Sequence, residues 1–184
     1  REPTNEWQEV LNQSYPEATH PDRIQGFYSS RNALLDCLQR FYPKASTTDL
    51  LLNDVRGLQN FPDMVVSLTH STFAGAAAVA KRTEYISIGI DIEPIDRLVK
   101  ESILARVTTI EDLKISSIQI WCLKEAIYKC VSNSHLYEGV LEFRDMRIQD
   151  RKWSHSPSGL SGEWELFEEE NHQIALATLK NQNS

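Results

Sequence analysis

Hydrophobic and polar residues alternate strictly along one stretch near the middle of the chain. Isoleucines stand at positions 86, 88, 90 and 92, and the residues between and after them are Ser87, Gly89, Asp91 and Glu93. Because side chains along a strand point alternately to its two faces, this alternation predicts a β-strand. The isoleucine face fixes its register, since a slip of one residue would place all four in water. We therefore expect Asp91 and Glu93 to lie side by side on a rigid strand.

Further along the chain, apolar residues recur at the spacing of an α-helix. The stripe consists of Cys122, Leu123, Ala126, Ile127, Cys130 and Val131. Glu125 and Lys129, four residues apart, lie roughly 40° apart around such a helix, and Lys124 lies on the flank of the stripe. If this helix packs beside the strand, Glu125 adds a third carboxylate to Asp91 and Glu93. Carboxylate oxygens suit Mg²⁺, and such a site leaves positions open for phosphate oxygens.

A helix is also predicted over residues 23–41, with Ser29 or Ser30 as its N-terminal cap. Its expected buried side consists of Phe27, Leu34, Leu35, Leu38 and Phe41. This cap would place Arg31 near the start of a helix, where anions are favoured. The local pattern on its own favours a solvated arginine, so both interpretations stay open here.

An apolar strand is predicted over residues 64–71, followed by a returning strand of small residues over 74–79. The first strand runs into His70, which has hydroxyl residues beside it. A histidine in this position either donates to a phosphate or is satisfied by the loop backbone. The sequence alone does not favour the first interpretation.

The remaining pattern predicts further helices and a hairpin at the end of the chain. We expect an irregular arm over 1–22, helices over 48–55 and 97–107 and from Thr109, a strand-like segment over 141–148, and a hairpin over 163–168 and 173–179. His135, His155 and His172 fall in polar segments and are expected to be exposed. Each half of the chain has a helical portion and a strand pair, so the fold class expected is α+β with two related halves.

Composition narrows the class of protein. The chain has 184 residues, 41% of them hydrophobic and 24% charged, which suits one soluble domain or two small halves. A formal charge of −7 argues against general nucleic-acid binding. No apolar run approaches the roughly 18 residues that span a bilayer, so no membrane association is expected. Three cysteines without metal-ligand spacing indicate reduced thiols, and we expect a cytoplasmic protein.

Two of these segments together resemble the signatures of the 4′-phosphopantetheinyl transferases, which prime carrier proteins with the arm of coenzyme A. Residues 89–93 match the Gly-Ile-Asp-x-Glu strand, and residues 121–129 match the Trp-x-x-Lys-Glu-Ala-x-x-Lys helix. Residues 69–79 resemble the family's Ser-His-Ser strand end and the small-residue strand that follows it, and residues 27–31 its Phe-x-x-x-Arg helix. Ninety residues precede Asp91, so the chain is similar to the double-length type of surfactin and enterobactin synthesis.

The resemblance implies a pseudo-dimer of two similar α+β halves, residues 1–83 and 84–184, in a monomeric chain. Coenzyme A would lie between the halves, with magnesium, or manganese in its place, on its diphosphate. The metal carboxylates would be Asp91, Glu93 and Glu125. The phosphate contacts would be Lys124 and Lys129 at the diphosphate, and Arg31 and His70 at the 3′-phosphate.

The implied reaction is attack by a carrier-protein serine on the β-phosphate of coenzyme A, releasing adenosine 3′,5′-bisphosphate. Lys129 would offset charge on the leaving oxygen, Asp91 would hold the metal, and Glu125 would be the base. The chain departs from the family at Cys122, where serine or threonine is usual, and at Thr69, where serine is usual. Residues 72–73 and 132–135 also stand where the family has glycines, so recognition of the acceptor is open.

Two other classes compete with this interpretation. Metal-dependent nucleases also combine aspartate, glutamate and lysine, but their glutamate and lysine usually share a strand, and the acidic charge of this chain does not suit them. A non-catalytic coenzyme A-binding homologue would keep the fold, and the complete set of carboxylates argues against it. The transferase is therefore the function that the sequence favours.

Overall fold

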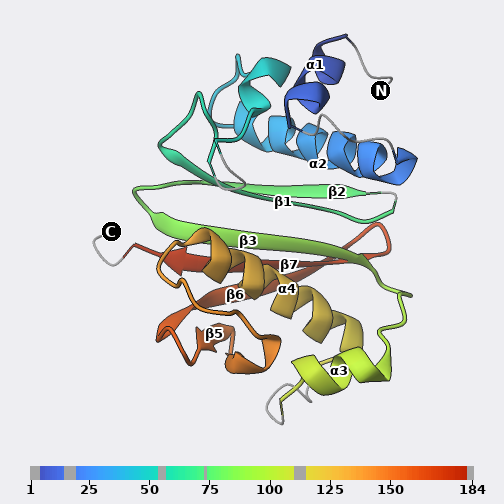
Figure 1. Ribbon diagram of the computed structural model, residues 1–184, viewed down its shortest axis with the longest axis vertical. Helices are drawn as coiled ribbons and strands as arrows, with labels where there is room; N and C mark the ends of the chain where they lie inside the picture. Colours follow the sequence, from blue (N-terminus) through green and yellow to red (C-terminus); the bar gives the residue numbers. More distant parts are fainter. Residues whose placement is uncertain (1–4, 15–19, 54–56, 73, 110–114, 182–184) are drawn as a thin grey trace.

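The computed structural model describes residues 5–14, 20–53, 57–72, 74–109 and 115–181. Within these ranges the chain forms four α-helices and two antiparallel sheets, which confirms the α+β class. Figure 1 shows the arrangement: helices α1 and α2 lie at one end, the strands form the middle, and α4 and α3 lie on the other side. No helix in the described ranges has the length and apolar character needed to cross a membrane.

The strands pair in two groups. β1 (Met64–His70) and β2 (Gly75–Lys81) form a two-stranded sheet. The second sheet has the order β3-β7-β6-β5-β4, with bounds β3 Tyr85–Pro94, β4 Met146–Gln149, β5 Lys152–His155, β6 Leu160–Glu169 and β7 His172–Lys180. The strands expected at residues 64–71, 74–79 and 86–93 and the terminal hairpin are confirmed. Strand β5, a short piece with one large apolar residue, was not predicted.

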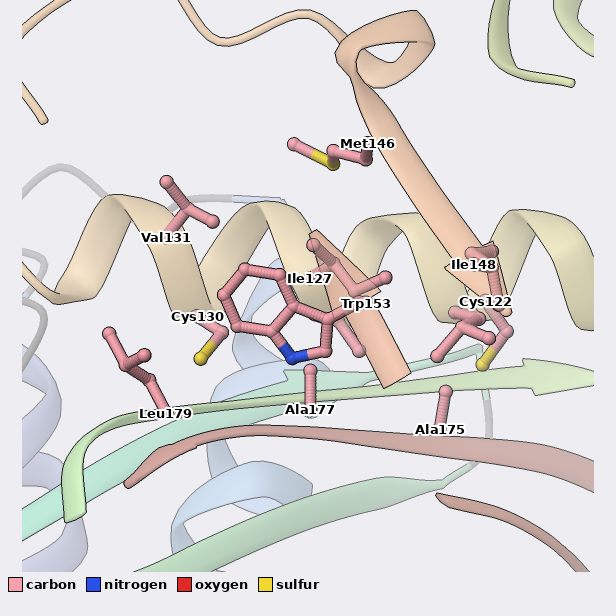
Figure 2. Packing of buried hydrophobic residues seen from close by; sticks show 12 residues of the cluster. Cys122, Ile127, Cys130, Val131, Met146, Ile148, Trp153, Ala175, Ala177 and Leu179 are labelled. Carbon is pink, nitrogen blue, oxygen red and sulfur yellow. The ribbon is translucent and has the colours of Figure 1, made fainter. Parts of the chain in front are cut away.

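Helix α4 (Ser117–Asn133) packs on the five-stranded sheet through the stripe read from the sequence. The helix begins at a capping box, in which the Ser116 side chain accepts from the Gln119 backbone. Figure 2 shows Trp153 of β5 in the middle of this core, with Ile127 and Cys130 from α4 and Ala177 from β7 around it. The helix therefore supplies one wall of a core whose other walls are strands.

Gly89 determines how closely α4 approaches β3. A Cβ atom on Gly89 would stand 2.0 Å from the Ala126 carbonyl oxygen and 2.6 Å from the Cys130 amide nitrogen. The polar face of β3 is consequently the face that meets the helix, and both faces are buried: Ile90 is 7% exposed and Asp91 is 5% exposed. This arrangement buries most of Asp91 and Glu93 beside α4.

Helix α2 (Pro21–Gln39) packs on the β1–β2 sheet and forms a second hydrophobic cluster with it. It begins at Pro21, eight or nine residues before the serines predicted to cap it, because His20 is the cap and Pro21 suits a first helical turn. The predicted cap at Ser29 or Ser30 is therefore wrong, and Arg31 lies in the middle of the helix. Phe41, predicted to be buried, lies beyond the helix and is 43% exposed.

Other segments depart from the expectations in length or type. The arm at the N-terminus contains α1 (Asn5–Ser14), and the helix expected over 48–55 is a 3₁₀ turn, η1 (Thr47–Leu50). Helix α3 (Glu101–Val107) starts later than predicted, and the 141–148 segment divides into η3 (Phe143–Asp145) and β4. The helix expected from Thr109 runs into residues 110–114, and the last residues expected for the 48–55 helix into 54–56, both outside the described residues.

The two sheets meet where β1 lies beside β3. No backbone ladder between these two strands is present in the described residues, and side chains bridge them instead. The Ile90 amide donates to Ser67 Oγ at 3.1 Å. A hydroxyl of β1 thus provides the hydrogen-bond acceptor for one backbone amide on the edge of β3 that faces β1. The junction between the sheets is thus polar at the level of Asp91, and the site described next opens there.

Candidate functional site

A cavity of about 1080 Å³ opens between α2 and β1 on one side and β3 and α4 on the other. Its lining includes six of the seven residues singled out in the sequence, namely Arg31, His70, Asp91, Glu93, Glu125 and Lys129. The fold thus brings to one cavity residues that lie almost a hundred positions apart. Arginines of α2 and the His70 ring of β1 stand opposite the carboxylates of β3 and α4.

Asp91 is held from two sides through one of its oxygens. Its Oδ1 accepts a hydrogen bond from Lys129 Nζ at 2.7 Å and another from Thr69 Oγ1 at 2.9 Å. Lys129 Nζ also donates to the carbonyl of Ile90 at 3.1 Å, which fixes the ammonium at the strand. Asp91 Oδ2 is buried and has no hydrogen-bond partner among the described residues. A buried carboxylate oxygen without a partner is costly, so this atom marks a place for a ligand.

Glu93 is held in the same way at the next position on that face. Its Oε1 accepts from the indole Nε1 of Trp121 at 2.9 Å and pairs with the Arg97 guanidinium. Arg97 in turn lies over the Trp121 ring, with 5.7 Å between the guanidinium carbon and the ring centroid. The tryptophan of the helix signature therefore has a defined task, which is to hold the second carboxylate of the strand.

Glu125 projects from α4 into the same cavity and is half-buried. Burial raises the pKa of its carboxyl group above the ordinary value, and the negative charge of Asp91 raises it further, while Lys129 opposes the shift. Carboxylates that raise one another's pKa lie within electrostatic reach of each other. Glu125 therefore takes a proton more readily than an ordinary glutamate does.

These three carboxylates match the donor set that a hard divalent cation prefers. As the side chains stand, no group of three or more histidine, cysteine, aspartate or glutamate residues in the described part of the chain is arranged to hold a metal ion. The donor chemistry nevertheless fits, since Asp91 Oδ2 is unpartnered, and Asp91, Glu93 and Glu125 all line one cavity.

Lys124 does not lie with the others. Its side chain is fully buried, and its Nζ donates to the carbonyl of Met146 and, at 3.5 Å, to that of Phe143. Lys124 is absent from the cavity lining, because it points to the segment that leads into β4. Its phosphate contact remains a prediction, and in this structure the side chain fastens α4 to that segment.

Arg31 and His70 form the opposite wall. Arg31 is 4% exposed, and its guanidinium carbon lies 5.0 Å from the centroid of the Phe27 ring. His70 ends β1 and is exposed, and its ring lies against α2 at Gly26, where a Cβ atom would stand 2.4 Å from Nδ1. Because Gly26 has no side chain, the His70 ring can pack directly against α2, on the same cavity wall as Arg31.

Three residues that shape the site had no role predicted from the sequence. Thr69 and Trp121 lie within segments that were identified, but their hydrogen bonds to Asp91 and Glu93 were not foreseen. Arg97 was missed altogether, although its position four residues after Glu93 is a signal for an ion pair. His155, expected to be exposed, is fully buried, and His172 is half-buried and within 3.2 Å of Ser71 Oγ.

Comparison with known families identifies the C-terminal part of the chain. A model described as the 4′-phosphopantetheinyl transferase superfamily matches residues 87–178, which is half of the chain. The match begins within β3 and includes Asp91, Glu93, Glu125 and Lys129. No curated protein was found to match the chain.

Proposed function

The chain belongs to the 4′-phosphopantetheinyl transferase superfamily, and we propose that it transfers the phosphopantetheine arm of coenzyme A to a serine of an acyl or peptidyl carrier protein. The observation that carries this proposal is the single cavity with cationic groups on one wall and three carboxylates with Lys129 on the other. Its volume of about 1080 Å³ slightly exceeds the range of ordinary ligand pockets, about 300–1,000 Å³, and suits a large nucleotide.

Each wall of the cavity has its own task in this proposal. Arg31 and His70 bind the 3′-phosphate of the adenosine, because both line the α2 and β1 wall and have N–H groups that can donate to an anion. Asp91, Glu93 and Glu125 hold a magnesium ion, for which manganese is the natural substitute. When bound, that ion supplies positive charge to the oxygens of the diphosphate. Lys124 joins the diphosphate contacts only if its side chain leaves the carbonyl groups it now contacts.

In the proposed reaction the carrier serine forms a bond from Oγ to the β-phosphorus of coenzyme A. The bond from that phosphorus to the bridging oxygen breaks, and adenosine 3′,5′-bisphosphate leaves with the bonding electron pair. Lys129 stands beside Asp91 and offsets charge on the leaving oxygen. Glu125 takes the serine proton, since the raised pKa of its carboxyl group lies closer to the operating pH than that of an ordinary glutamate.

The chain would work as a pseudo-dimer in one polypeptide, with residues 1–83 and 84–184 as its halves. Two separate hydrophobic clusters support this division, one around α2 with β1 and β2 and one around α4 with the larger sheet. A monomer would be sufficient for this function, because the cavity takes residues from both halves of the same chain. Cys37, Cys122 and Cys130 are free thiols, which suits a cytoplasmic enzyme.

Mass spectrometry of carrier proteins tests this function. Candidate carriers are incubated with the protein, coenzyme A and magnesium, and the expected result is a phosphopantetheine adduct on one serine. Excess chelator should abolish the adduct, and magnesium or manganese should restore it. Unmodified carriers in every combination would contradict the transferase, whereas full activity in excess chelator would remove only the metal from the proposal.

A further inference from the structure

In each of the two carboxylates of β3, Asp91 and Glu93, one oxygen accepts the hydrogen bonds from protein donors. In Asp91 both hydrogen-bond donors, Thr69 and Lys129, meet Oδ1. In Glu93 both donors, Trp121 and Arg97, meet Oε1. Asp91 Oδ2 is buried and has no hydrogen-bond partner among the described residues. Neither Trp121 nor Arg97 donates to Oε2 of Glu93. Each carboxylate is thus fixed through one oxygen and keeps the other for a ligand.

Arg97 is placed to act on Glu93 from outside the cavity. It follows β3 in a turn whose backbone is closed by a 3.1 Å hydrogen bond from the Arg97 amide to the Pro94 carbonyl. Its side chain is 45% exposed and does not belong to the cavity lining, whereas Glu93 does. The guanidinium also lies over the Trp121 ring, so the donor pair on Oε1 is itself packed together. Arg97 therefore restrains Glu93 without occupying the cavity.

We propose that Arg97 is a positioning residue for the divalent cation, acting through Glu93. This inference rests on the proposed function, in which Glu93 is a ligand. With Trp121, Arg97 fixes the carboxylate in one orientation, so that the second oxygen is ready to bind an ion. Groups that orient a metal ligand in this way commonly change metal affinity by about 10- to 100-fold when they are removed.

The charge of Arg97 acts in the opposite direction, because a guanidinium repels a second cation. Its half-exposed position allows solvent to screen that repulsion. The orienting effect, by contrast, depends on direct contact with Glu93, which is only 8% exposed. Orientation should therefore outweigh repulsion. If orientation dominates, replacing Arg97 weakens binding of the divalent cation, whereas if repulsion dominates, replacing it strengthens that binding.

Manganese alone is the probe that separates the two effects. Free Mn²⁺ is measured by electron paramagnetic resonance during titration of the parent, Arg97→Gln and Arg97→Met, with no coenzyme A present. Gln keeps a donor but loses the charge, and Met loses both while its chain still covers Trp121. We expect affinity to fall about 10-fold for Arg97→Met and less for Arg97→Gln. Thermal melting of each variant without metal verifies that the fold is intact.

Two further variants make the result specific. Arg106→Met removes an exposed arginine of α3 and should bind manganese like the parent. Glu93→Gln removes the assigned ligand and should weaken manganese binding more than Arg97→Met does. Parental or tighter binding by Arg97→Met would overturn this proposal, as would a parent that binds no manganese. If Glu93→Gln binds like the parent, the metal assignment in the proposed function fails as well, whereas transfer itself is judged separately by the carrier adduct.

Discussion

Thr69 on β1 donates a hydrogen bond of 2.9 Å to Asp91 on β3, and this bond crosses from one sheet to the other. Both residues are buried, with Thr69 7% exposed and Asp91 5% exposed. The two strands share no backbone ladder at this point in the described chain, so the side-chain bond is a direct link between the sheets. The residue that orients the aspartate thus comes from the opposite half of the molecule.

Replacing Thr69 with valine should therefore affect stability and turnover together. The change keeps the shape but removes the hydroxyl, and a buried hydrogen bond to a charged group contributes about 1.5–3 kcal/mol. We expect a loss of about that size in the free energy of unfolding from urea titration, with a fall in kcat. Thr69→Ser restores the donor and is the matched control. Parental stability and kcat in Thr69→Val would show that the bond has no such role.

The cationic wall of the cavity predicts a difference between two donors. Arg31→Ala and His70→Ala should raise KM for coenzyme A by about 10-fold or more, since each loses a charge-assisted contact to phosphate. With dephospho-coenzyme A, which lacks the 3′-phosphate, both variants should resemble the parent. The measurement is kcat/KM for each donor. An equal loss with both donors would contradict the assignment of these residues to the 3′-phosphate.

Glu125→Gln separates the role of base from that of ligand. Glutamine keeps the size and an oxygen ligand but cannot take the serine proton. If Glu125 is the base, turnover should fall roughly 10²–10⁴-fold while coenzyme A still binds. A titration of turnover with magnesium for the variant and the parent checks this. Near-parental turnover at saturating magnesium would contradict the role of base.

The buried histidine of β5 predicts a dependence of stability on pH. Burial lowers the pKa of His155, and the carboxylate of Asp145 only partly offsets this. The unfolded chain binds the proton at the ordinary pKa of about 6.5, and the folded protein binds it only at lower pH. The stability is therefore fully present above about pH 6.5 and is lost as pH falls through the folded-state pKa.

His155→Gln should remove this part of the pH dependence. Urea titrations at about pH 7 and about pH 5 give the free energy of unfolding of both proteins. We expect the parent to lose more stability than the variant between the two values. The ring contributes at both pH values through its 2.7 Å contact with Ser158, so the comparison uses the difference between pH values and not the absolute stability. An identical change in both proteins would show that His155 does not titrate differently on folding.

The segments with strong periodicity could be predicted from the sequence because one physical rule dominates each of them. The isoleucine alternation predicted β3, and the apolar stripe predicted α4, since burial of one face decides both structures. The same rule did not reveal that the polar face of β3 is also buried. That burial depends on the close approach of α4 at Gly89, which is a contact between distant segments.

The side chains whose partners lie far along the chain could not be placed from the sequence. Lys124 and Lys129 belong to one motif, yet only Lys129 lines the cavity, because the carbonyls of the β4 segment receive Lys124. His155 lies in a polar stretch, but the fold buries it beside Tyr137, with 4.8 Å between their ring centroids. Sequence patterns report only on residues close together along the chain. The side-chain positions of Lys124 and His155 depend on tertiary packing with distant segments.

The most direct test of the central claim is the turnover of Asp91→Asn beside that of Asp96→Asn. Asp91 lines the cavity with a free oxygen, whereas Asp96 is an exposed residue in the turn after β3. Both changes replace a carboxylate with an amide of the same shape. The transfer of phosphopantetheine from coenzyme A to a carrier serine should fall about 100-fold or more in Asp91→Asn, since even groups that only orient a metal ligand contribute about 10- to 100-fold. It should stay parental in Asp96→Asn. Near-parental turnover of Asp91→Asn at saturating magnesium would contradict the account.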